Sequence, residues 1–241
     1  YYKKTDYLLK VELKKIKVLG IIPARQGSKG VLNKNFKLVK KNKRLIDYTL
    51  IAAKKSKYIT KIALTTDDER IIRYSKKYKI DYILKRKKKL ATDNIKSSSV
   101  VIDTINQIKD FKADFIILLQ PTSPLRNSFH IDETIRLLCK NYKKYNSLVS
   151  VSLYEEPHPY KLKKIQKKYL VPFLKGANSE VPRQKLVKAY KLNGSIYLIK
   201  KKSFIKKKHF FDKTMPFIMD EKFSLNIDTY NDFKKLKKLE E

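Results

Sequence analysis

The sequence predicts an α/β fold built on a doubly wound, mostly parallel sheet. Short apolar runs alternate with segments of helical periodicity, which is the pattern of repeated strand–helix–strand units. Residues 115–119 form the most apolar run, and a strand that is apolar on both faces belongs at the centre of such a sheet. With 241 residues, 42% of them hydrophobic, the chain is long enough to bury one domain core.

The elements are expected in a regular order. The run 16–23 ends in a glycine-containing turn, so it is predicted as the first buried strand. The acids Asp67, Asp68 and Glu69 are expected to open a helix, where negative charge favours the helix dipole. Further strands are predicted over 61–66, 80–84, 147–153 and 195–199, and further helices over 45–57, 97–108, 129–143 and 230–239.

Residues 155–188 interrupt this alternation. They hold four of the eight prolines, and the runs 161–165 and 169–174 flank a polar turn, as in a hairpin. An excursion of this length in a compact domain is usually functional or an oligomer contact. We therefore expect one domain over residues 16–241, with 155–188 as an inserted arm and 1–15 as an N-terminal extension.

The charge of the chain is strongly basic, with a formal net charge of +35. The cations are 50 lysines against only 8 arginines, spread along the whole chain, which favours a solvated surface over a nucleic-acid site. A basic nucleic-acid-binding protein stays as the alternative, although zinc-finger and helix-turn-helix patterns are absent from the sequence. The first fifteen residues lack signal-peptide features, no apolar run is long enough for a membrane span, and Cys139 is the single cysteine. A cytoplasmic protein with neither nucleic-acid nor membrane partners is predicted.

Three polar segments follow predicted strands. Residues 23–30 follow the first strand, 65–68 the second, and 120–126 the central one. Because the carboxyl ends of parallel strands share one edge, and ligands bind at that edge, these segments are expected to form one site.

The first of these segments has the composition of a phosphate-binding turn. Gly27 and Gly30 allow a tight turn whose backbone N–H groups can hold an anion, and Arg25, Lys29 and Lys34 add positive charge. The pattern matches neither the P-loop nor the dinucleotide-binding glycine motif. A basic surface turn is the alternative interpretation.

Six segments, taken together, resemble the CMP-sialic acid synthetases (acylneuraminate cytidylyltransferases) in order and spacing, over about residues 16–232. They are Ile21–Asn35, Leu118–Arg126, Val149–Val151 with His158, Pro159 and Lys161, Pro182–Gln184, Asn193–Tyr197, and Ser224–Thr229 with Asp232. The resemblance implies a fold like the nucleotide-diphospho-sugar transferases and transfer of CMP from CTP to the anomeric hydroxyl of a nonulosonic, sialic-type sugar acid, releasing pyrophosphate. It also implies a homodimer in which the arm reaches the partner's site.

The resemblance assigns roles to individual residues. Arg25, Ser28, Lys29 and Lys34 match the triphosphate site, and Asn35 and Arg86 the nucleotide site, although Lys87 stands where the family has proline and one residue is inserted before Arg86. Arg126 is expected to hold its loop or a carboxylate within it. The sugar-side positions are Gln120, Lys161, Arg183, Gln184, Asn193, Tyr197, Phe210 and Phe211. For the last three, plain core packing is an equal interpretation.

The metal position departs from the family. Mg²⁺ binds one or two carboxylates together with phosphate oxygens. The family has two acids one residue apart, and this chain has Asn226 followed by Asp228. A Mg²⁺ site with one carboxylate and one amide oxygen is predicted, with weakened metal binding or lost activity as alternatives. The sugar acid itself stays open among sialic, legionaminic, pseudaminic and eight-carbon acids.

Overall fold

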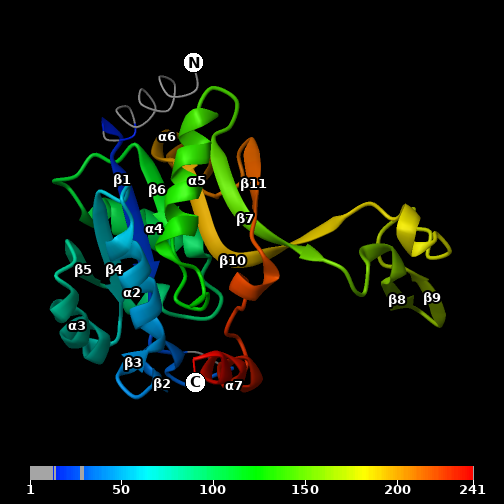
Figure 1. Cartoon of the computed structure of the whole chain (residues 1–241), viewed down its shortest axis with the longest axis horizontal. Coiled ribbons are helices and arrows are strands. Elements are labelled where there is room, and N and C mark those ends of the chain that lie inside the picture. The colour runs from blue at the N-terminus through cyan, green and yellow to red at the C-terminus, as the bar shows by residue number, and fades with distance from the viewer. Residues whose placement is uncertain (1–12, 14, 28–29, 241) are drawn as a thin grey trace.

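The computed structural model describes residues 13, 15–27 and 30–240. The predicted extension, residues 1–15, lies almost wholly outside them, as do Ser28 and Lys29. The described chain folds around one sheet in the order β11-β7-β10-β6-β1-β4-β5 (Figure 1). Its strands are β1 (Val18–Pro23), β4 (Lys61–Thr66), β5 (Tyr82–Lys85), β6 (Phe115–Leu118), β7 (Ser147–Tyr154), β10 (Ala189–Lys200) and β11 (Thr214–Ile218). The helices are α2 (Leu45–Lys55), α3 (Glu69–Ser75), α4 (Ser97–Gln107), α5 (Ser128–Lys140), α6 (Lys201–Lys207) and α7 (Tyr230–Leu239).

Strand β6 lies in the middle of the sheet and is buried along its whole length, as predicted. Strands β6, β1, β4 and β5 are parallel, so Ile21 of β1 lies opposite both Ala63 of β4 and Leu118 of β6. Alternate residues of β1 contact two helical layers: Ile22 packs in the cluster that contains α2 and α5, and Ile21 in the cluster that contains α4 and α6. The predicted doubly wound, mostly parallel sheet is confirmed.

Strand β10 is longer than predicted and is antiparallel to its neighbours in the sheet. It pairs antiparallel with both β6 and β7, and the predicted strand 195–199 is only its second half. Its register shifts between Leu192 and Tyr197, where Gly194 has a φ of +72°. A Cβ at Gly194 would lie only 3.3 Å from Gln120 Oε1, so glycine serves both the bulge and the close approach.

Strand β11 was not predicted. It pairs parallel with β7 at the edge of the sheet and contains Pro216. A proline inside a run argues against a central strand, but it is tolerated at an edge because no neighbour there needs its missing N–H. Because it contains a proline, β11 could not be recognised as a strand from its composition.

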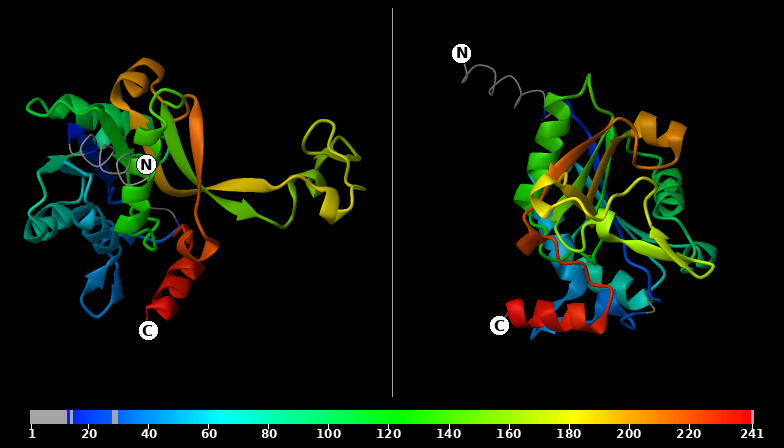
Figure 2. Two further views of the ribbon diagram at one scale, coloured as in Figure 1. Left: turned by 45° about the horizontal axis from the view of Figure 1, so that its top comes forward. Right: turned by 90° about the vertical axis from the view of Figure 1, so that its right-hand side faces the viewer.

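The arm projects from the sheet as two strand extensions joined by a distal hairpin. The far ends of β7 and β10 form its base, and β8 (Lys163–Gln166) pairs antiparallel with β9 (Tyr169–Pro172) at its tip (Figures 1 and 2). Large apolar side chains of the tip are exposed, with Ile165 at 79% and Leu170 at 70%. The predicted hairpin is present, two residues shorter at either outer end.

Helix α7 closes the fold beside the β2 (Leu38–Lys40) and β3 (Lys43–Arg44) hairpin (Figure 1). Phe233 and Leu236 of α7 pack in one buried cluster with Val31 and Val39. This packing brings the segment 224–229 back to the end of β1. Within residues 13, 15–27 and 30–240, none of the helices combines the length and apolar character that a membrane span requires.

Candidate active site

A cleft of about 390 Å³ opens at the carboxyl ends of the parallel strands. It gathers residues from five segments of the chain: after β1, after β5, before α4, after β6 and before α7. The lining residues include Arg25, Lys34, Asn35, Arg86, Asp93, Gln120, Thr122, Asn226 and Asp228. Of the three segments predicted to share one rim, 23–30 and 120–126 both line this cleft, whereas 65–68 contributes no lining residue.

The predicted phosphate-binding turn is fixed at both of its described ends. Asp67, after β4, accepts a hydrogen bond from Gln26 N–H at 2.9 Å. At the other end a Cβ on Gly30 would lie 1.9 Å from the Asp228 carbonyl oxygen, so no side chain fits there. Ser28 and Lys29 lie between these two ends and are predicted to contact the triphosphate. Both are outside the residues that the structure describes.

Lys34 and Asn35 stand at the back of the turn. Lys34 Nζ donates to Ile227 O at 2.7 Å and to Asp228 Oδ1 at 3.2 Å. Asn35 is buried, and its Nδ2 donates to Arg25 O at 3.0 Å. Its Oδ1 is buried and has no hydrogen-bond partner among the described residues. A buried acceptor of this kind is costly unless a ligand donates to it, which is what the predicted nucleotide role requires.

Arg86 also lines the cleft. It is 5% exposed, and its Nη2 donates to Thr65 O at 2.9 Å. Its Nε finds no partner in the described part of the chain. Burial, as the main cause, lowers the pKa of Arg86 to about 10. The inserted residue and Lys87 therefore leave Arg86 inside the cleft, with a spare donor for an acceptor on a ligand.

Gln120 and Arg126 form the loop after β6. Gln120 lines the cleft, as predicted. Arg126 is fully buried and donates to Gln120 O at 3.2 Å, to Ser195 O at 3.0 Å and to Thr49 Oγ1 at 2.7 Å. Burial lowers the pKa of Arg126 to about 9. Of the two predicted roles, Arg126 takes the first: it holds the loop that presents Gln120.

Asn226 and Asp228 line the floor of the cleft beside Lys34. Asn226 Nδ2 donates to Asp228 Oδ2, and the Asn226 Oδ1 atom is buried without a partner in the described chain. No group of three or more His, Cys, Asp or Glu side chains in that same part of the chain is placed to hold a metal ion. One carboxylate and one unpaired amide oxygen still fit Mg²⁺, which takes its other ligands from phosphates and water.

The sugar-side predictions divide into a core group and an arm group. Phe210 is buried with Phe204, and Tyr197 packs against Phe210 with ring centroids 5.6 Å apart. Phe211 is 47% exposed. Asn193 already accepts from Ser150 Oγ at 2.6 Å through its side chain. The geometry thus gives Tyr197, Phe210 and Asn193 packing or hydrogen-bonding roles inside the fold.

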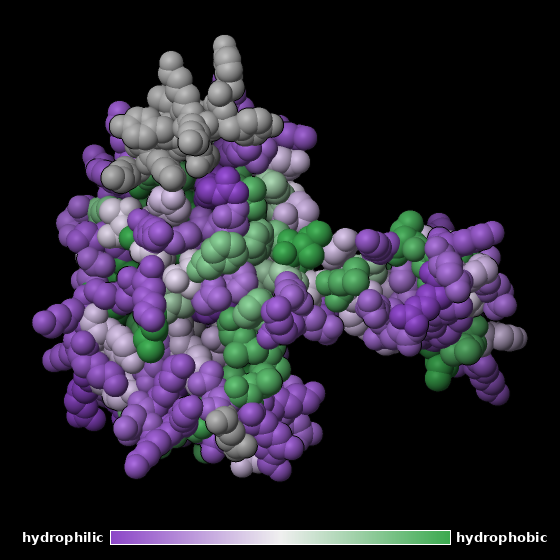
Figure 3. Space-filling model, viewed as in Figure 1, coloured by the Kyte–Doolittle hydropathy of each residue, from purple (hydrophilic) through white to green (hydrophobic). Residues whose placement is uncertain are grey.

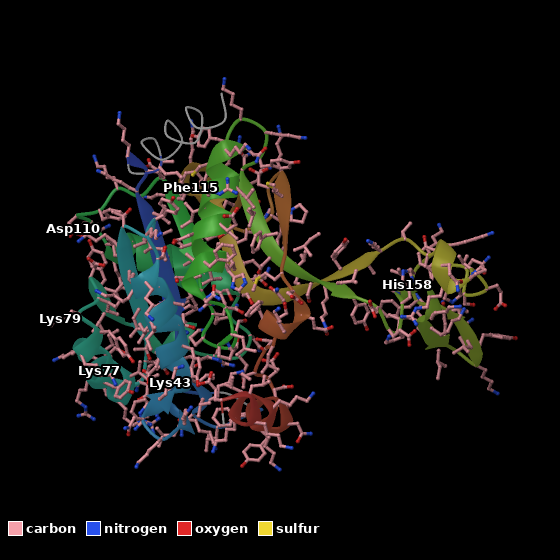
Figure 4. All side chains as sticks on the ribbon, viewed as in Figure 1. Lys43, Lys77, Lys79, Asp110, Phe115 and His158 are labelled. Carbon is pink, nitrogen blue, oxygen red and sulfur yellow. The ribbon has the colours of Figure 1, made fainter. Side chains whose placement is uncertain are left out.

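Lys161, Arg183 and Gln184 lie on the arm and not in the cleft of their own chain. Lys161 and Arg183 line a separate hollow at the arm's base, where Arg183 pairs with Glu156 at 2.9 Å. His158 accepts from Tyr160 N–H through Nδ1, which places the ring proton on Nε2, donating to Val187 O at 2.9 Å. His158 therefore secures the arm, far from the sheet end where Phe115 begins β6 (Figure 4).

Two acids near the cleft have contacts that were not predicted. Asp67 was predicted to lie on the rim within 65–68 and to help open a helix, but its hydrogen bond from Gln26 N–H was not predicted. Asp93 was passed over, yet its Oδ1 pairs with Arg25 Nη2 at 2.5 Å. The strand-end argument that placed 65–68 on the rim would also have included Asp93, because Asp93 follows β5 in the chain.

The sheet topology and the cation-lined cleft at its strand ends define an α/β nucleotidyltransferase fold. A solved structure with this fold is a CMP:2-keto-3-deoxy-manno-octonic acid synthetase complexed with CTP, with a TM-score of 0.67, 16% identity, and coverage of 93% of this chain and 98% of that one. The chain belongs to the cytidylyltransferase family, whose model matches residues 19–241.

Two curated relatives carry more specific names. An N-acylneuraminate cytidylyltransferase of Escherichia coli is 35% identical over 90% of this chain and 50% of its own length. A CMP-N,N'-diacetyllegionaminic acid synthase of Legionella pneumophila is 34% identical over 94% of this chain and 97% of its own length. The chain thus spans about half of the first relative and nearly all of the second.

Proposed function

We propose that this protein transfers CMP from CTP to the anomeric hydroxyl of a nonulosonic, sialic-type sugar acid and releases pyrophosphate. The carrying observation is the single cleft that joins Arg25, Lys34, Asn35 and Arg86 to Gln120 and Asp228. Family membership and the names of the relatives support the class of nucleotide and of acceptor. The alternative of a nucleic-acid-binding protein rests on the net charge of the chain alone.

The cleft suits phosphoryl transfer because such a step depends on positioning and charge neutralisation rather than on covalent help. Arg25 and Lys34 neutralise the triphosphate. The unpaired Asn35 Oδ1 accepts from a nucleotide hydroxyl, and the Arg86 Nε donor meets an acceptor on the base. Gln120 offers both a donor and an acceptor to the hydroxyls of the sugar acid.

A divalent metal fits the floor of the cleft. Asp228 and the Asn226 Oδ1 atom would hold Mg²⁺, which supplies positive charge to the phosphates when bound. Lys34 donates to the same Asp228 carboxylate at 3.2 Å and orients it. Lys34 and Asp228 therefore act as an oriented pair, in which Asp228 holds the metal and Lys34 contacts the phosphates.

The arm supports a homodimer with shared sites. The exposed apolar side chains of its tip appear among polar ones on the projecting arm (Figure 3), and an exposed set of this kind marks an interface. A sugar acid carries a carboxylate that arginine binds bidentately. Arg183 and Lys161, outside the cleft of their own chain, meet that carboxylate in the partner's cleft.

Pyrophosphate release, measured with each of the four nucleoside triphosphates and a panel of sugar acids, tests the proposal. The panel holds sialic, legionaminic, pseudaminic and eight-carbon acids, because the sequence leaves the acid open and the two relatives named above, at 35% and 34% identity, carry the names of different acids. CTP-dependent release that needs a nine-carbon acid supports it. Release without any sugar acid, or with ATP alone, contradicts it, and release with only the eight-carbon acid would replace the proposed acceptor.

A further inference from the structure

An ion pair joins two residues that line the cleft that the triphosphate is expected to occupy. Arg25 follows β1, and Asp93 lies in the turn before α4, so the two side chains come from separate segments of the chain. Arg25 Nη2 and Asp93 Oδ1 are 2.5 Å apart, and the side chains are 31% and 34% exposed. The Asp93 carboxylate thus binds the guanidinium of Arg25, which the proposed reaction requires for binding phosphate.

The position of Asp93 has a cost for ligand binding. Two like charges close together in a partly enclosed site repel by several times what they would in bulk water. A polyphosphate that binds Arg25 must displace Asp93 and then lie beside its charge. The Asp93 carboxylate therefore weakens the binding of a polyphosphate, which is the ligand that the cations of the cleft would bind.

The same carboxylate has a benefit when the cleft is empty. Arg25 and the buried Arg86 are near enough for the charge of one to act on the other. Without a counter-ion, the flexible Arg25 side chain would be repelled from the cleft towards water. Asp93 holds the guanidinium across the opening, where an arriving phosphate meets it already in place.

We propose that Asp93 is an exchangeable counter-ion for Arg25. It positions the guanidinium in the empty cleft, yields it to the triphosphate, and takes it back as pyrophosphate leaves, which speeds release of that product. The inference rests on the proposed function only in assigning a phosphate ligand to Arg25. No bond other than hydrogen bonds and ion pairs changes in this exchange.

The test compares pyrophosphate binding, by titration calorimetry, between the wild type and Asp93→Asn. Removing the competing charge is expected to tighten pyrophosphate binding about three- to tenfold, the scale of a partly exposed ion pair. In turnover, the variant should show a lower KM for CTP, stronger product inhibition by pyrophosphate, and an unchanged or lower kcat. Asp93→Glu, which keeps the charge, should restore weaker binding.

Two controls separate this role from a structural one. Glu69→Gln removes the same charge from an exposed pair with Lys85, outside the cleft, and should leave pyrophosphate affinity unchanged. In an Arg25→Ala background, Asp93→Asn should no longer tighten binding, because its effect acts through Arg25. Thermal unfolding confirms that each variant is folded.

The outcomes are decisive in both directions. Unchanged or weaker pyrophosphate binding in Asp93→Asn, or tightening that persists without Arg25, overturns the counter-ion role. A wild type that fails to bind pyrophosphate removes both this role and the proposed function. A wild type that binds pyrophosphate but does not use CTP contradicts the proposed function alone, and the counter-ion comparison still stands.

Discussion

Arg86 in the cleft and Arg183 on the arm are two of only eight arginines in a chain with 50 lysines, yet their surroundings contrast. Arg86 is 5% exposed and fixed to the Thr65 carbonyl group. The side chain of Arg183 is 66% exposed and pairs with the equally exposed Glu155 and Glu156. A surface pair of this kind contributes little to stability, whereas a buried guanidinium needs every donor satisfied.

The contrast supports a division of the proposed site between one chain and a partner. The cleft has its cations oriented by backbone carbonyls and by neighbouring acids, so it is ready for a phosphate ligand. The arm has cations and apolar side chains that no described part of its own chain covers. In the proposed function, the nucleotide half of the site therefore belongs to a single chain, and the arm of a partner chain completes the half for the sugar acid.

The largest expected effect separates the cleft from the arm most sharply. Arg25→Ala removes a cation that meets developing charge on the phosphates, and kcat/KM should fall by about 10² to 10³. Thermal unfolding should stay close to wild type because the Arg25 side chain is 31% exposed. Steady-state pyrophosphate release measures the first and calorimetry the second. Near-normal CTP kinetics would show that this turn does not hold the triphosphate.

The next effect tests whether the two halves of a site come from different chains. Arg25→Ala and Arg183→Ala are each expected to give a nearly inactive homodimer. When the two variants are co-expressed and paired, each mixed dimer regains one site with an intact cleft and an intact partner arm. An equal mixture should recover about a quarter of wild-type turnover. No recovery in purified mixed dimers would place Arg183 outside the partner's site.

The sequence was sufficient to predict where the cleft lies. The strand-end rule alone places Arg25 and Gln120 on one rim, and the structure places both in the same cleft. The centre of the sheet was predicted from the apolar run at 115–119 for the same reason: burial on both faces leaves a pattern in composition.

The sequence was not sufficient where side chains from distant loops meet. The pairing of Asp93 with Arg25, and of Asp67 with Gln26, depends on loop conformations that no periodic pattern encodes. The direction of β10 was missed because an apolar run has the same composition in either direction. The aromatic pair at 210–211 matched a ligand site and a core equally, and Phe210 is buried in the core.

A smaller effect concerns the floor of the cleft. Asn226→Asp adds a second carboxylate beside Asp228, so the Mg²⁺ concentration that gives half-maximal turnover should fall, by about three- to tenfold. A magnesium titration of pyrophosphate release measures it. Asn231→Asp adds the same charge on exposed α7 and serves as the control. A titration that is the same for Asn226→Asp and the wild type would show that position 226 is not a ligand.

The smallest expected effect concerns the pH dependence of stability, and it arises in α5 and not in the arm. His130 is the third residue of α5, and its Nδ1 accepts from Asn127 N–H at 3.3 Å. Burial, with the nearby charge of Arg126, lowers the pKa of His130 below its ordinary value of 6.5. The unfolded chain therefore takes up a proton near pH 6.5 while the folded chain does not. Stability should be lost as the pH falls below 6.5, by at most about 1.4 kcal/mol per pH unit, until the folded pKa is reached.

His130→Gln keeps a capping side chain at this position but cannot titrate, so its urea midpoint should change less than that of the wild type between pH 7.5 and 5. Equal slopes for the two proteins would mean that His130 does not carry this pH dependence.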